Sequence, residues 1–187
     1  MTEVPRAVLI GNSGVGKTSL VHRMAHGSFQ SDLAPTIGAG VTPITLKIDD
    51  KEYMIHIWDT AGQEVFRHVV PLYFRDATCA ILVYSLTDED SLGELDGWLK
   101  VLKTYNEADV PLVVIANKCD LDMNPSLITR GKSWAQAHDA QYFFTSAYSG
   151  QNIQAALDVI AQICYNSNNN HVERSIPIQN NTKKGCC

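Results

Sequence analysis

A glycine-rich stretch near the amino terminus constrains this chain most strongly. Residues 11–18 read GNSGVGKT and fit the pattern G-x-x-x-x-G-K-[ST], with Gly11, Gly16, Lys17 and Thr18 in the required positions. The stretch follows the apolar run AVLI and precedes a helical pattern. Glycines let successive backbone N–H groups curve around phosphate oxygens without a Cβ in the way. The sequence therefore predicts a phosphate-binding loop between a strand and a helix.

Each part of this loop has an expected role. The amino end of the helix adds partial positive charge. Lys17 is expected to reach the terminal phosphates of a nucleotide, and the Thr18 hydroxyl is expected to ligate Mg²⁺. A glycine-rich turn that merely caps a helix is the alternative. It fits less well, because the pattern and its strand–helix context agree.

Short apolar runs alternate with helical patterns along the chain. The runs have the length of strands, and turn residues stand at their ends. Asp49 and Asp50 separate two of the runs and predict a hairpin turn. The expected strands cover residues 7–11, 41–48, 53–59, 79–85, 111–117 and 141–146.

Helical spacing of apolar residues appears between the later strands. Leucines recur at this spacing over residues 92–102, and isoleucines and a leucine do so over residues 153–160. Trp134 and Ala137 indicate a shorter helix between the last two strands. We therefore expect an α/β fold of the P-loop NTPase type, with a six-stranded, mostly parallel sheet and helices on both faces.

The composition predicts one domain and a tail. The chain has 187 residues, 45% of them hydrophobic and 19% charged, which is typical of a soluble globular protein. The apolar period ends near residue 166, and the stretch that follows, rich in Asn, buries too little apolar surface to offset the entropy of ordering. We expect a domain over residues 1–165 and a flexible tail over residues 166–187.

Charge and hydropathy exclude several classes of function. The net charge of −5 offers no broad basic surface, so we expect no nucleic acid as a partner. No apolar run approaches the roughly 20 residues that a membrane-spanning helix needs, and a cytosolic protein is expected unless it is anchored. Cys79, Cys119 and Cys164 stand singly in apolar or helical surroundings, which indicates buried thiols rather than disulfides.

Two loops after expected strands indicate which base the nucleotide carries. NKCD at residues 117–120 contains Asn117, Lys118 and Asp120. A carboxylate at this edge can accept hydrogen bonds from N1 and N2 of guanine, whereas adenine presents an acceptor at N1 and no amine at C2. TSA at residues 145–147 is placed to offer a backbone N–H to the guanine O6. The sequence therefore favours guanine over adenine.

A third motif, WDTAGQE at residues 58–64, lies between the phosphate and base motifs. Asp59 ends an apolar run and can hold Mg²⁺. Gly62 can offer its N–H to the γ-phosphate, and Gln63 can orient an attacking water. These residues predict hydrolysis of the terminal phosphate.

Together the motifs resemble those of small GTPases of the Ras superfamily and, within it, the Rab group. They follow the family's order from Gly11 to Ala147, and WDTAGQEVFR, LYFRDA and LVYSLTDEDSL resemble Rab segments. The resemblance implies a G domain that binds GTP or GDP with Mg²⁺. It also implies slow GTP hydrolysis by a molecular switch in vesicle and membrane trafficking. Two alternatives remain: a nucleotide-binding interaction module with negligible turnover, and a Ras-superfamily member with a signalling role outside trafficking.

The resemblance also implies a residue set. Residues 30–41 and 60–75 correspond to the two switch segments, ordered by GTP and released after hydrolysis. Lys17, Thr36, Gly62 and Gln63 are the implied catalytic residues, and Thr18, Thr36 and Asp59 the implied Mg²⁺ residues. The implied nucleotide contacts are Ser13, Gly14, Val15, Gly16, Lys17, Thr18, Ser19, Phe29, Thr36, Gly62, Asn117, Lys118, Asp120, Ser146 and Ala147.

The sequence ends in KKGCC, which resembles the Rab signal for double geranylgeranylation at Cys186 and Cys187. Two prenyl chains give stable membrane anchoring. The implied partners are an exchange factor, a GTPase-activating protein, effectors that bind the switch segments, a prenylation escort and a GDP-dissociation inhibitor. We expect a monomer that cycles between the cytosol and the cytoplasmic face of an intracellular membrane.

Three departures from the Rab pattern concern partners and affinity. Residues 39–41 read Ala-Gly-Val where Rabs usually carry a valine, an acidic residue and a phenylalanine. Tyr148 stands where the guanine-binding loop usually has lysine, and Val65 where Rabs usually carry arginine. We therefore expect altered effector and exchange-factor contacts and an altered nucleotide affinity.

Overall fold

The computed structural model describes residues 4–34, 36, 38–60, 71–106 and 109–174 of the chain. Several predicted functional residues fall outside these ranges. They are Gly62, Gln63, Val65, Cys186 and Cys187.

Among the described residues, the strands form one six-stranded sheet with the order β2-β3-β1-β4-β5-β6. Every neighbouring pair is parallel except β2 and β3, which are antiparallel. The strands are β1 (Arg6–Ile10), β2 (Ala39–Ile48), β3 (Lys51–Thr60), β4 (Cys79–Ser85), β5 (Leu112–Asn117) and β6 (Gln141–Phe144).

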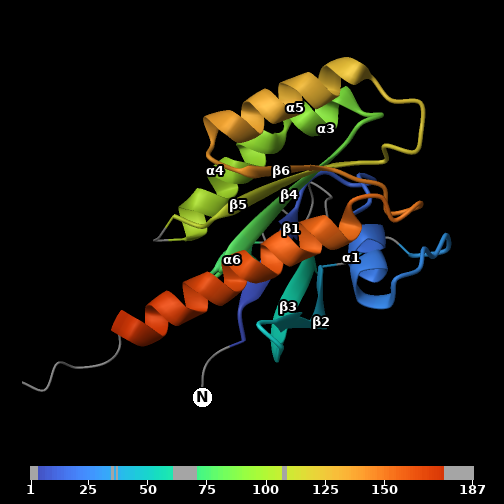
Figure 1. Ribbon diagram of the computed structural model, residues 1–187. Helices are drawn as coiled ribbons and strands as arrows, with labels where there is room; N and C mark the ends of the chain where they lie inside the picture. Colours follow the sequence, from blue (N-terminus) through green and yellow to red (C-terminus); the bar gives the residue numbers. More distant parts are fainter. Residues whose placement is uncertain (1–3, 35, 37, 61–70, 107–108, 175–187) are drawn as a thin grey trace, which may run out of the picture.

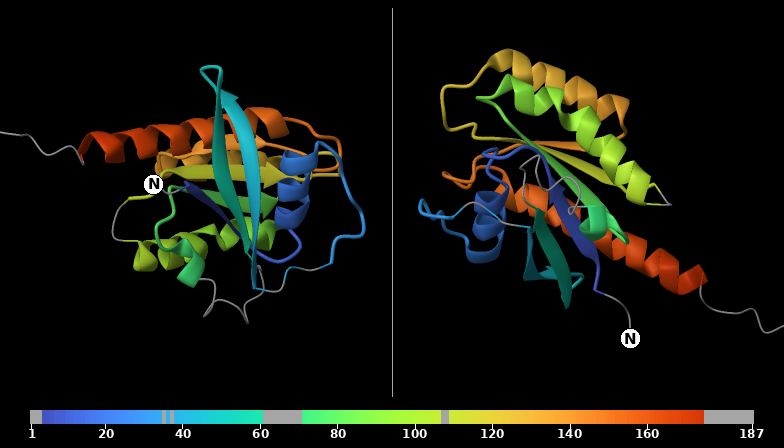
Figure 2. Two further views of the ribbon diagram at one scale, coloured as in Figure 1. Left: turned by 90° about the horizontal axis from the view of Figure 1, so that it is seen from below. Right: turned by 180° about the vertical axis from the view of Figure 1, so that it is seen from behind.

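The β2–β3 hairpin lies at the edge of the sheet (Figure 2). Asp49 and Asp50 form its turn with positive φ angles of 50° and 61°, the backbone that a two-residue type I′ turn requires at both positions. Pro43 lies within β2 opposite His56. Proline is tolerated there because an edge strand leaves some backbone positions without a ladder partner.

Helices cover both faces of the sheet (Figure 1). One layer contains α1 (Lys17–His26) and α6 (Ile153–Arg174). The other layer contains α2 (Pro71–Phe74), α3 (Glu89–Gly93), α4 (Leu95–Tyr105) and α5 (Pro125–Ala137). The predicted α/β fold with a mostly parallel sheet is confirmed.

Successive side chains along each strand point to opposite faces of the sheet, so the core consists of two clusters, one on each face. In β1, Ala7 and Leu9 pack in the cluster beneath α1 and α6, whereas Val8 and Ile10 pack in the cluster beneath α4 and α5. All four side chains are fully buried. Strands buried on both faces have nearly continuous apolar sequences, which is why the runs were recognisable.

The helical pattern over residues 92–102 is interrupted. The structure has two helices, α3 and α4, that meet at Glu94, whose N–H lies within hydrogen-bonding distance of the carbonyls of Asp90 and Leu92. Gly93 precedes this break, and glycine is a poor helix former. The apolar spacing continues across the break, so the spacing alone did not reveal it.

The last helix is longer than the apolar pattern. α6 continues to Arg174, beyond residue 166, where the apolar period ends. The period reports a buried face and not the helix itself, so its end does not fix where the helix ends. The division into a domain over residues 1–165 and a tail over residues 166–187 stays a prediction. No helix within the described ranges is long and apolar enough to cross a membrane.

Candidate functional site

A pocket of about 530 Å³ lies among the loops that follow the parallel strands. Strands β1, β3, β4, β5 and β6 run parallel, so their carboxyl ends share one edge of the sheet, where ligands of such folds bind. The sequence-predicted residues that line the pocket are Ser13, Gly14, Gly16, Lys17, Thr18, Ser19, Phe29, Thr36, Asn117, Lys118, Asp120 and Ala147.

The other predicted residues lie behind this lining or outside the described ranges. Val15 is fully buried beneath the glycine-rich loop. Asp59 and Ser146 are buried too, and each is hydrogen bonded to a lining residue. Gly62 and Gln63 lie outside the described residues.

The loop needs glycine at two positions, because other parts of the chain lie too close to its backbone there for a side chain. Gly11 has φ +147°, and a Cβ there would lie 2.2 Å from the Val83 carbonyl oxygen. Gly16 has φ +97°, and a Cβ would lie 2.5 Å from Nδ2 of Asn117. Side chains at these positions would separate the loop from β4 and from the base-binding segment.

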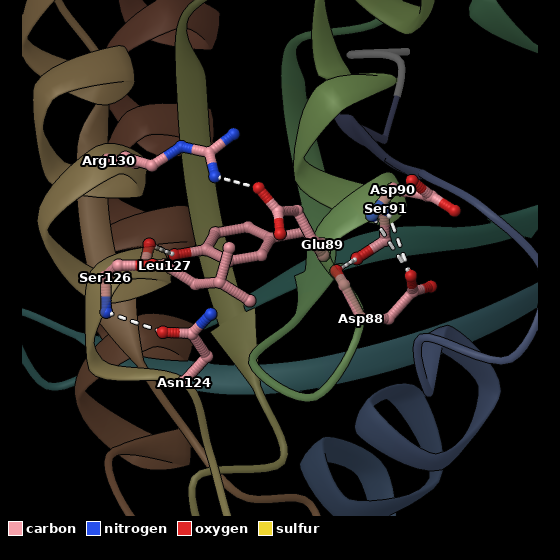
Figure 3. A network of polar contacts seen from close by, with 9 residues as sticks. Asp88, Glu89, Asp90, Ser91, Asn124, Ser126, Leu127 and Arg130 are labelled. Atoms are coloured by element: carbon pink, nitrogen blue, oxygen red, sulfur yellow. Dashed lines mark hydrogen bonds and ion pairs between the residues drawn. The ribbon is translucent and has the colours of Figure 1, made fainter.

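The amino end of α1 differs from those of two other helices. Asp88 accepts hydrogen bonds from two amides of α3, and Asn124 accepts one from the Ser126 amide of α5 (Figure 3). α1 begins after Gly16, which has no side chain to cap the helix, and the described residues show no side-chain cap hydrogen bond there. Uncapped amides at a helix amino end are suited to bind an anion.

Lys17 crosses the loop from the first turn of α1. Its Nζ donates to the carbonyl oxygens of Gly11 and Asn12, both at 2.8 Å. The side chain is only 6% exposed. Burial lowers the pKa of Lys17 to about 8, and the charge of Asp59 partly opposes this shift. An anion bound beside the amine would therefore stabilise its charged form.

Three oxygen-bearing side chains meet beside Lys17. The Thr18 hydroxyl lies 2.6 Å from the Thr36 hydroxyl and donates to Oδ2 of Asp59 at 2.6 Å, and Thr36 also donates to Oδ2 at 3.0 Å. Burial raises the pKa of Asp59, and the two hydroxyl hydrogen bonds oppose that rise. The other carboxylate oxygen, Oδ1, is buried without a hydrogen-bond partner among the described residues.

This cluster fits a magnesium site. Mg²⁺ prefers hard oxygen ligands such as hydroxyls, carboxylates and phosphates. A cation beside the cluster would also satisfy the unpartnered, buried Oδ1 of Asp59. The chemistry of Thr18, Thr36 and Asp59 is therefore that expected of Mg²⁺ ligands and their supporting residues.

The base motif connects the two ends of the pocket. Asn117 Nδ2 donates to the Val15 carbonyl at 2.9 Å, and its Oδ1 accepts from the Ala147 amide at 3.2 Å. Ser146 Oγ donates to Asp120 Oδ1 at 2.6 Å. Asn117 therefore holds the glycine-rich loop and the 145–147 loop together, while Ser146 orients the carboxylate expected to read the base.

Some pocket residues were not anticipated from the sequence. Leu33, Ala34, Thr60 and Leu121 line it. Thr60 follows Asp59 directly, and its hydroxyl donates to the Leu9 carbonyl at 2.5 Å. The other three are small or apolar residues whose position depends on the path of a loop, and no sequence pattern marks them.

A buried residue outside the pocket supports its loop. Trp98 of α4 is 1% exposed, and its Nε1 donates to Oδ1 of Asn12 at 2.8 Å. The indole thereby ties the second residue of the glycine-rich loop to the opposite helical layer. Trp98 was not singled out from the sequence, because a contact across 86 residues has no local signature.

Comparisons with known proteins agree with this geometry. The sequence profile of the Ras family matches residues 6–166. Ras-related protein Rab-13 of Mesocricetus auratus is 36% identical over 158 residues, which cover 84% of this chain and 78% of the relative. Ras-related protein Rab-8B of Dictyostelium discoideum is 34% identical over 186 residues, which cover 97% and 92%. Ras-related protein Rab-22A of Canis lupus familiaris is 36% identical over 149 residues, which cover 79% and 77%.

The profile match includes the glycine-rich loop, the oxygen cluster and both base-binding loops. GTPases of this family generally bind GTP or GDP with Mg²⁺. The resemblance drawn from the motifs is confirmed: the chain belongs to the Ras family and is a Rab-like small GTPase, an enzyme that hydrolyses GTP.

Proposed function

We propose that this chain binds GTP or GDP with Mg²⁺ in the pocket at the carboxyl edge of the sheet and works as a nucleotide-controlled switch. One observation carries the proposal. Thr18, Thr36 and Asp59 come from the start of α1, the segment before β2 and the end of β3, and their oxygens meet. An ion and a terminal phosphate bound there would join three segments that are far apart in the sequence.

The phosphates are assigned to the glycine-rich loop. Residues 13–19 supply backbone amides and the uncapped end of α1. Lys17 would exchange its contacts with loop carbonyls for contacts with the terminal phosphates. Thr18 and Thr36 would hold Mg²⁺, with Asp59 holding it through water. Bound Mg²⁺ would supply positive charge that neutralises the phosphates and the leaving group.

The base is assigned to the loops after β5 and β6. Asp120 would accept the N1 and N2 hydrogen bonds of guanine, and the Ala147 amide would lie near O6. Lys118 has φ +68° and lines the pocket, and it would lie beside the base. Phe29 would pack against the ring from the side of α1.

Hydrolysis needs a water placed in line with the terminal phosphate. We assign its orientation to Gln63 and a backbone hydrogen bond on the γ-phosphate to Gly62, both from the sequence motif. Lys17 would stabilise charge that develops as the phosphate leaves. A GTPase-activating protein would accelerate this slow reaction by supplying a further donor.

Residues 30–41 and 60–75 are proposed as the two switch segments. Thr36 belongs to the first, and its hydroxyl bonds with Thr18 and Asp59 give that segment a connection to the phosphate end of the pocket. GTP would hold both segments, and loss of the γ-phosphate would release them. Exchange factors and effectors would recognise this difference.

The similarity to Rab-named proteins supports a role in membrane trafficking.

Effectors would bind beside β2, where Val41 is 45% exposed and pairs in register with Trp58. Because residues 39–41 depart from the usual Rab pattern, we propose an effector set that differs from those of typical Rabs. A GDP-dissociation inhibitor would carry the GDP form through the cytosol.

Anchoring is proposed through geranylgeranyl groups on Cys186 and Cys187, with a prenylation escort delivering the chain. Lys183 and Lys184 would add about 1 kcal/mol each near an anionic leaflet. Changing both cysteines to serine should move the protein from membrane to soluble fractions of cells. A serine variant that stays on membranes would contradict this assignment.

Hydrogen–deuterium exchange tests the switch. The chain is loaded with GDP or with a non-hydrolysable GTP analogue, each with Mg²⁺. We expect slower exchange over residues 30–41 with the analogue, and unchanged exchange over α5 as an internal control. Identical exchange in both states would favour a nucleotide-binding module without a switch.

A further inference from the structure

Two aromatic side chains from distant parts of the chain meet at the base end of the pocket. Phe29 follows α1 and Tyr148 follows β6, and their ring centroids lie 5.3 Å apart with an interplanar angle of 76°. This is the edge-to-face geometry that aromatic pairs favour. Phe29 is 38% exposed and Tyr148 64% exposed, so the pair lies at the pocket rim and not in the core.

A single arginine holds the backbone beneath this pair. Arg23 lies in α1, and its Nε donates to the Ala147 carbonyl at 2.7 Å. One terminal nitrogen donates to the Gly27 carbonyl at 2.7 Å, and the other donates to the Tyr148 carbonyl. A guanidinium presents these donors in a rigid plane. Arg23 therefore ties the segment that leads to Phe29 to the loop that carries Tyr148.

The same loop is held from its other side by the base-reading residues. The Ala147 amide donates to Asn117, while the Ala147 carbonyl accepts from Arg23. Ser146, next to it, donates to Asp120. Movement of this loop away from the pocket would break contacts on both sides. Its position is therefore coupled both to the base site and to α1.

We propose that Phe29 and Tyr148 form an aromatic latch over the base and that Arg23 is the positioning residue that keeps the latch closed. The inference rests on the proposed binding of guanine nucleotides in this pocket. Departure of the base requires the two rings to separate or the 146–148 loop to move, so the latch slows nucleotide release. The lysine that the guanine-binding loop usually carries at this position has no ring to offer Phe29, whereas Tyr148 has one.

Release of a fluorescent GDP derivative from the Mg²⁺-loaded full chain measures the latch. We expect Tyr148→Ala to release GDP roughly 2- to 10-fold faster, the range for loss of an aromatic pair. Tyr148→Phe keeps the ring and should release GDP at nearly the wild-type rate. Arg23→Ala removes three hydrogen bonds and should accelerate release about tenfold or more. Arg23→Lys keeps the charge without the fork, and its rate should fall between wild type and Arg23→Ala.

Matched controls come from the same chain. Tyr105→Ala removes another exposed tyrosine at the end of α4, and Arg130→Ala removes an arginine paired with Glu89 on the surface of α5. Neither residue lines the pocket, so both variants should release GDP like the wild type.

The double variant tests whether Arg23 acts through the latch. If it does, Arg23→Ala combined with Tyr148→Ala should accelerate release by less than the product of the single effects. An acceleration equal to the product of the two single effects would contradict the positioning role of Arg23. Wild-type release rates in both single variants would overturn the latch while leaving the proposed function intact. A chain that binds no GDP would contradict the proposed function and the latch together.

Discussion

The Thr18 hydroxyl donates a 2.6 Å hydrogen bond to the Asp59 carboxylate across 41 residues of sequence. This bond joins the start of α1 to the end of β3, and Thr36 adds the segment before β2 to the same carboxylate. Both hydrogen bonds join residues that are distant in the sequence. The cluster therefore depends on the tertiary fold, and a metal ion or phosphate that binds it acts on all three segments.

Replacing Thr18 with valine should weaken Mg²⁺ binding and leave the fold intact. Valine keeps the shape but removes the hydroxyl, so we expect Mg²⁺ affinity in the GDP complex to fall about 10- to 100-fold. The measurement is GDP release as a function of free Mg²⁺. Thr104→Val, which removes an exposed hydroxyl that bonds within α4, is the control and should not change the Mg²⁺ dependence.

Replacing Asp120 with asparagine should change the base that the pocket accepts. The carboxylate complements the N1 and N2 donors of guanine, whereas an amide complements the carbonyl that xanthine carries at C2. We expect GTP binding to weaken by about 100-fold or more and binding of xanthosine triphosphate to appear. Competition with fluorescent GDP measures both. Asp122→Asn, an exposed neighbour outside the pocket, should keep the wild-type preference, and an unchanged preference in Asp120→Asn would refute its role.

The pH dependence of the free energy of unfolding and of nucleotide binding should report the titration of Lys17. Its pKa is about 8 in the folded chain, against an ordinary value of 10.5. Between these pH values the unfolded chain binds more protons, so the contribution of Lys17 to the free energy of unfolding rises with pH over this range. Phosphate favours the charged amine and raises its pKa again. Nucleotide binding above pH 8 should therefore take up a proton and weaken as pH rises.

Calorimetric titrations with GDP at pH 8.5, in buffers of different ionisation enthalpy, measure this proton uptake. The Lys17→Met variant lacks the titrating amine, so its GDP binding should show no such proton uptake. An uptake that is equal in wild type and variant would show that the proton binds elsewhere.

Two helical glycines should respond to alanine in opposite directions. A Cβ at Gly131 of α5 would lie 2.1 Å from the Tyr84 hydroxyl oxygen and 2.7 Å from its ring, whereas a Cβ at Gly97 of α4 would meet only a Glu94 carboxylate oxygen at 3.5 Å. Gly131→Ala should lower the free energy of unfolding by about 1–3 kcal/mol. Gly97→Ala should raise it by about 0.5–1 kcal/mol because alanine is the better helix former. Urea unfolding with saturating GDP compares the two, and equal effects would contradict the packing around Tyr84.

The sequence predicted the central strands β1, β4 and β5 well because they are buried on both faces and have continuous apolar runs. Residues that a motif demands, such as Lys17 and Thr18, do line the pocket, while their contacts with a nucleotide stay a prediction. The sequence did not reveal the break at Glu94, because the apolar spacing of one helix continues into the next. The extent of α6 was missed for a related reason, since burial and not helix formation produces the apolar period.

The supporting contacts of the site were beyond sequence reasoning. Within the part of the chain that the structure describes, Arg23 bonds to backbone carbonyls, which every residue offers, so nothing in the identity of Ala147 or Tyr148 indicates the contact. Trp98 reads as an ordinary core residue, although its indole N–H holds Asn12 of the glycine-rich loop. Tyr148 was recognised as unusual, but its ring contact with Phe29 depends on two loop paths that only the tertiary structure defines.

Single-turnover hydrolysis of radiolabelled GTP by the Mg²⁺-loaded chain tests the account most directly. We expect bound GTP to convert to GDP at roughly 10⁻⁴ to 10⁻² per second, and Gln63→Leu to hydrolyse it at least about tenfold more slowly. The Gln63→Leu variant should still bind GTP and GDP like the wild type. Failure of the wild-type chain to retain a guanine nucleotide, or equal hydrolysis by wild type and Gln63→Leu, would contradict the account.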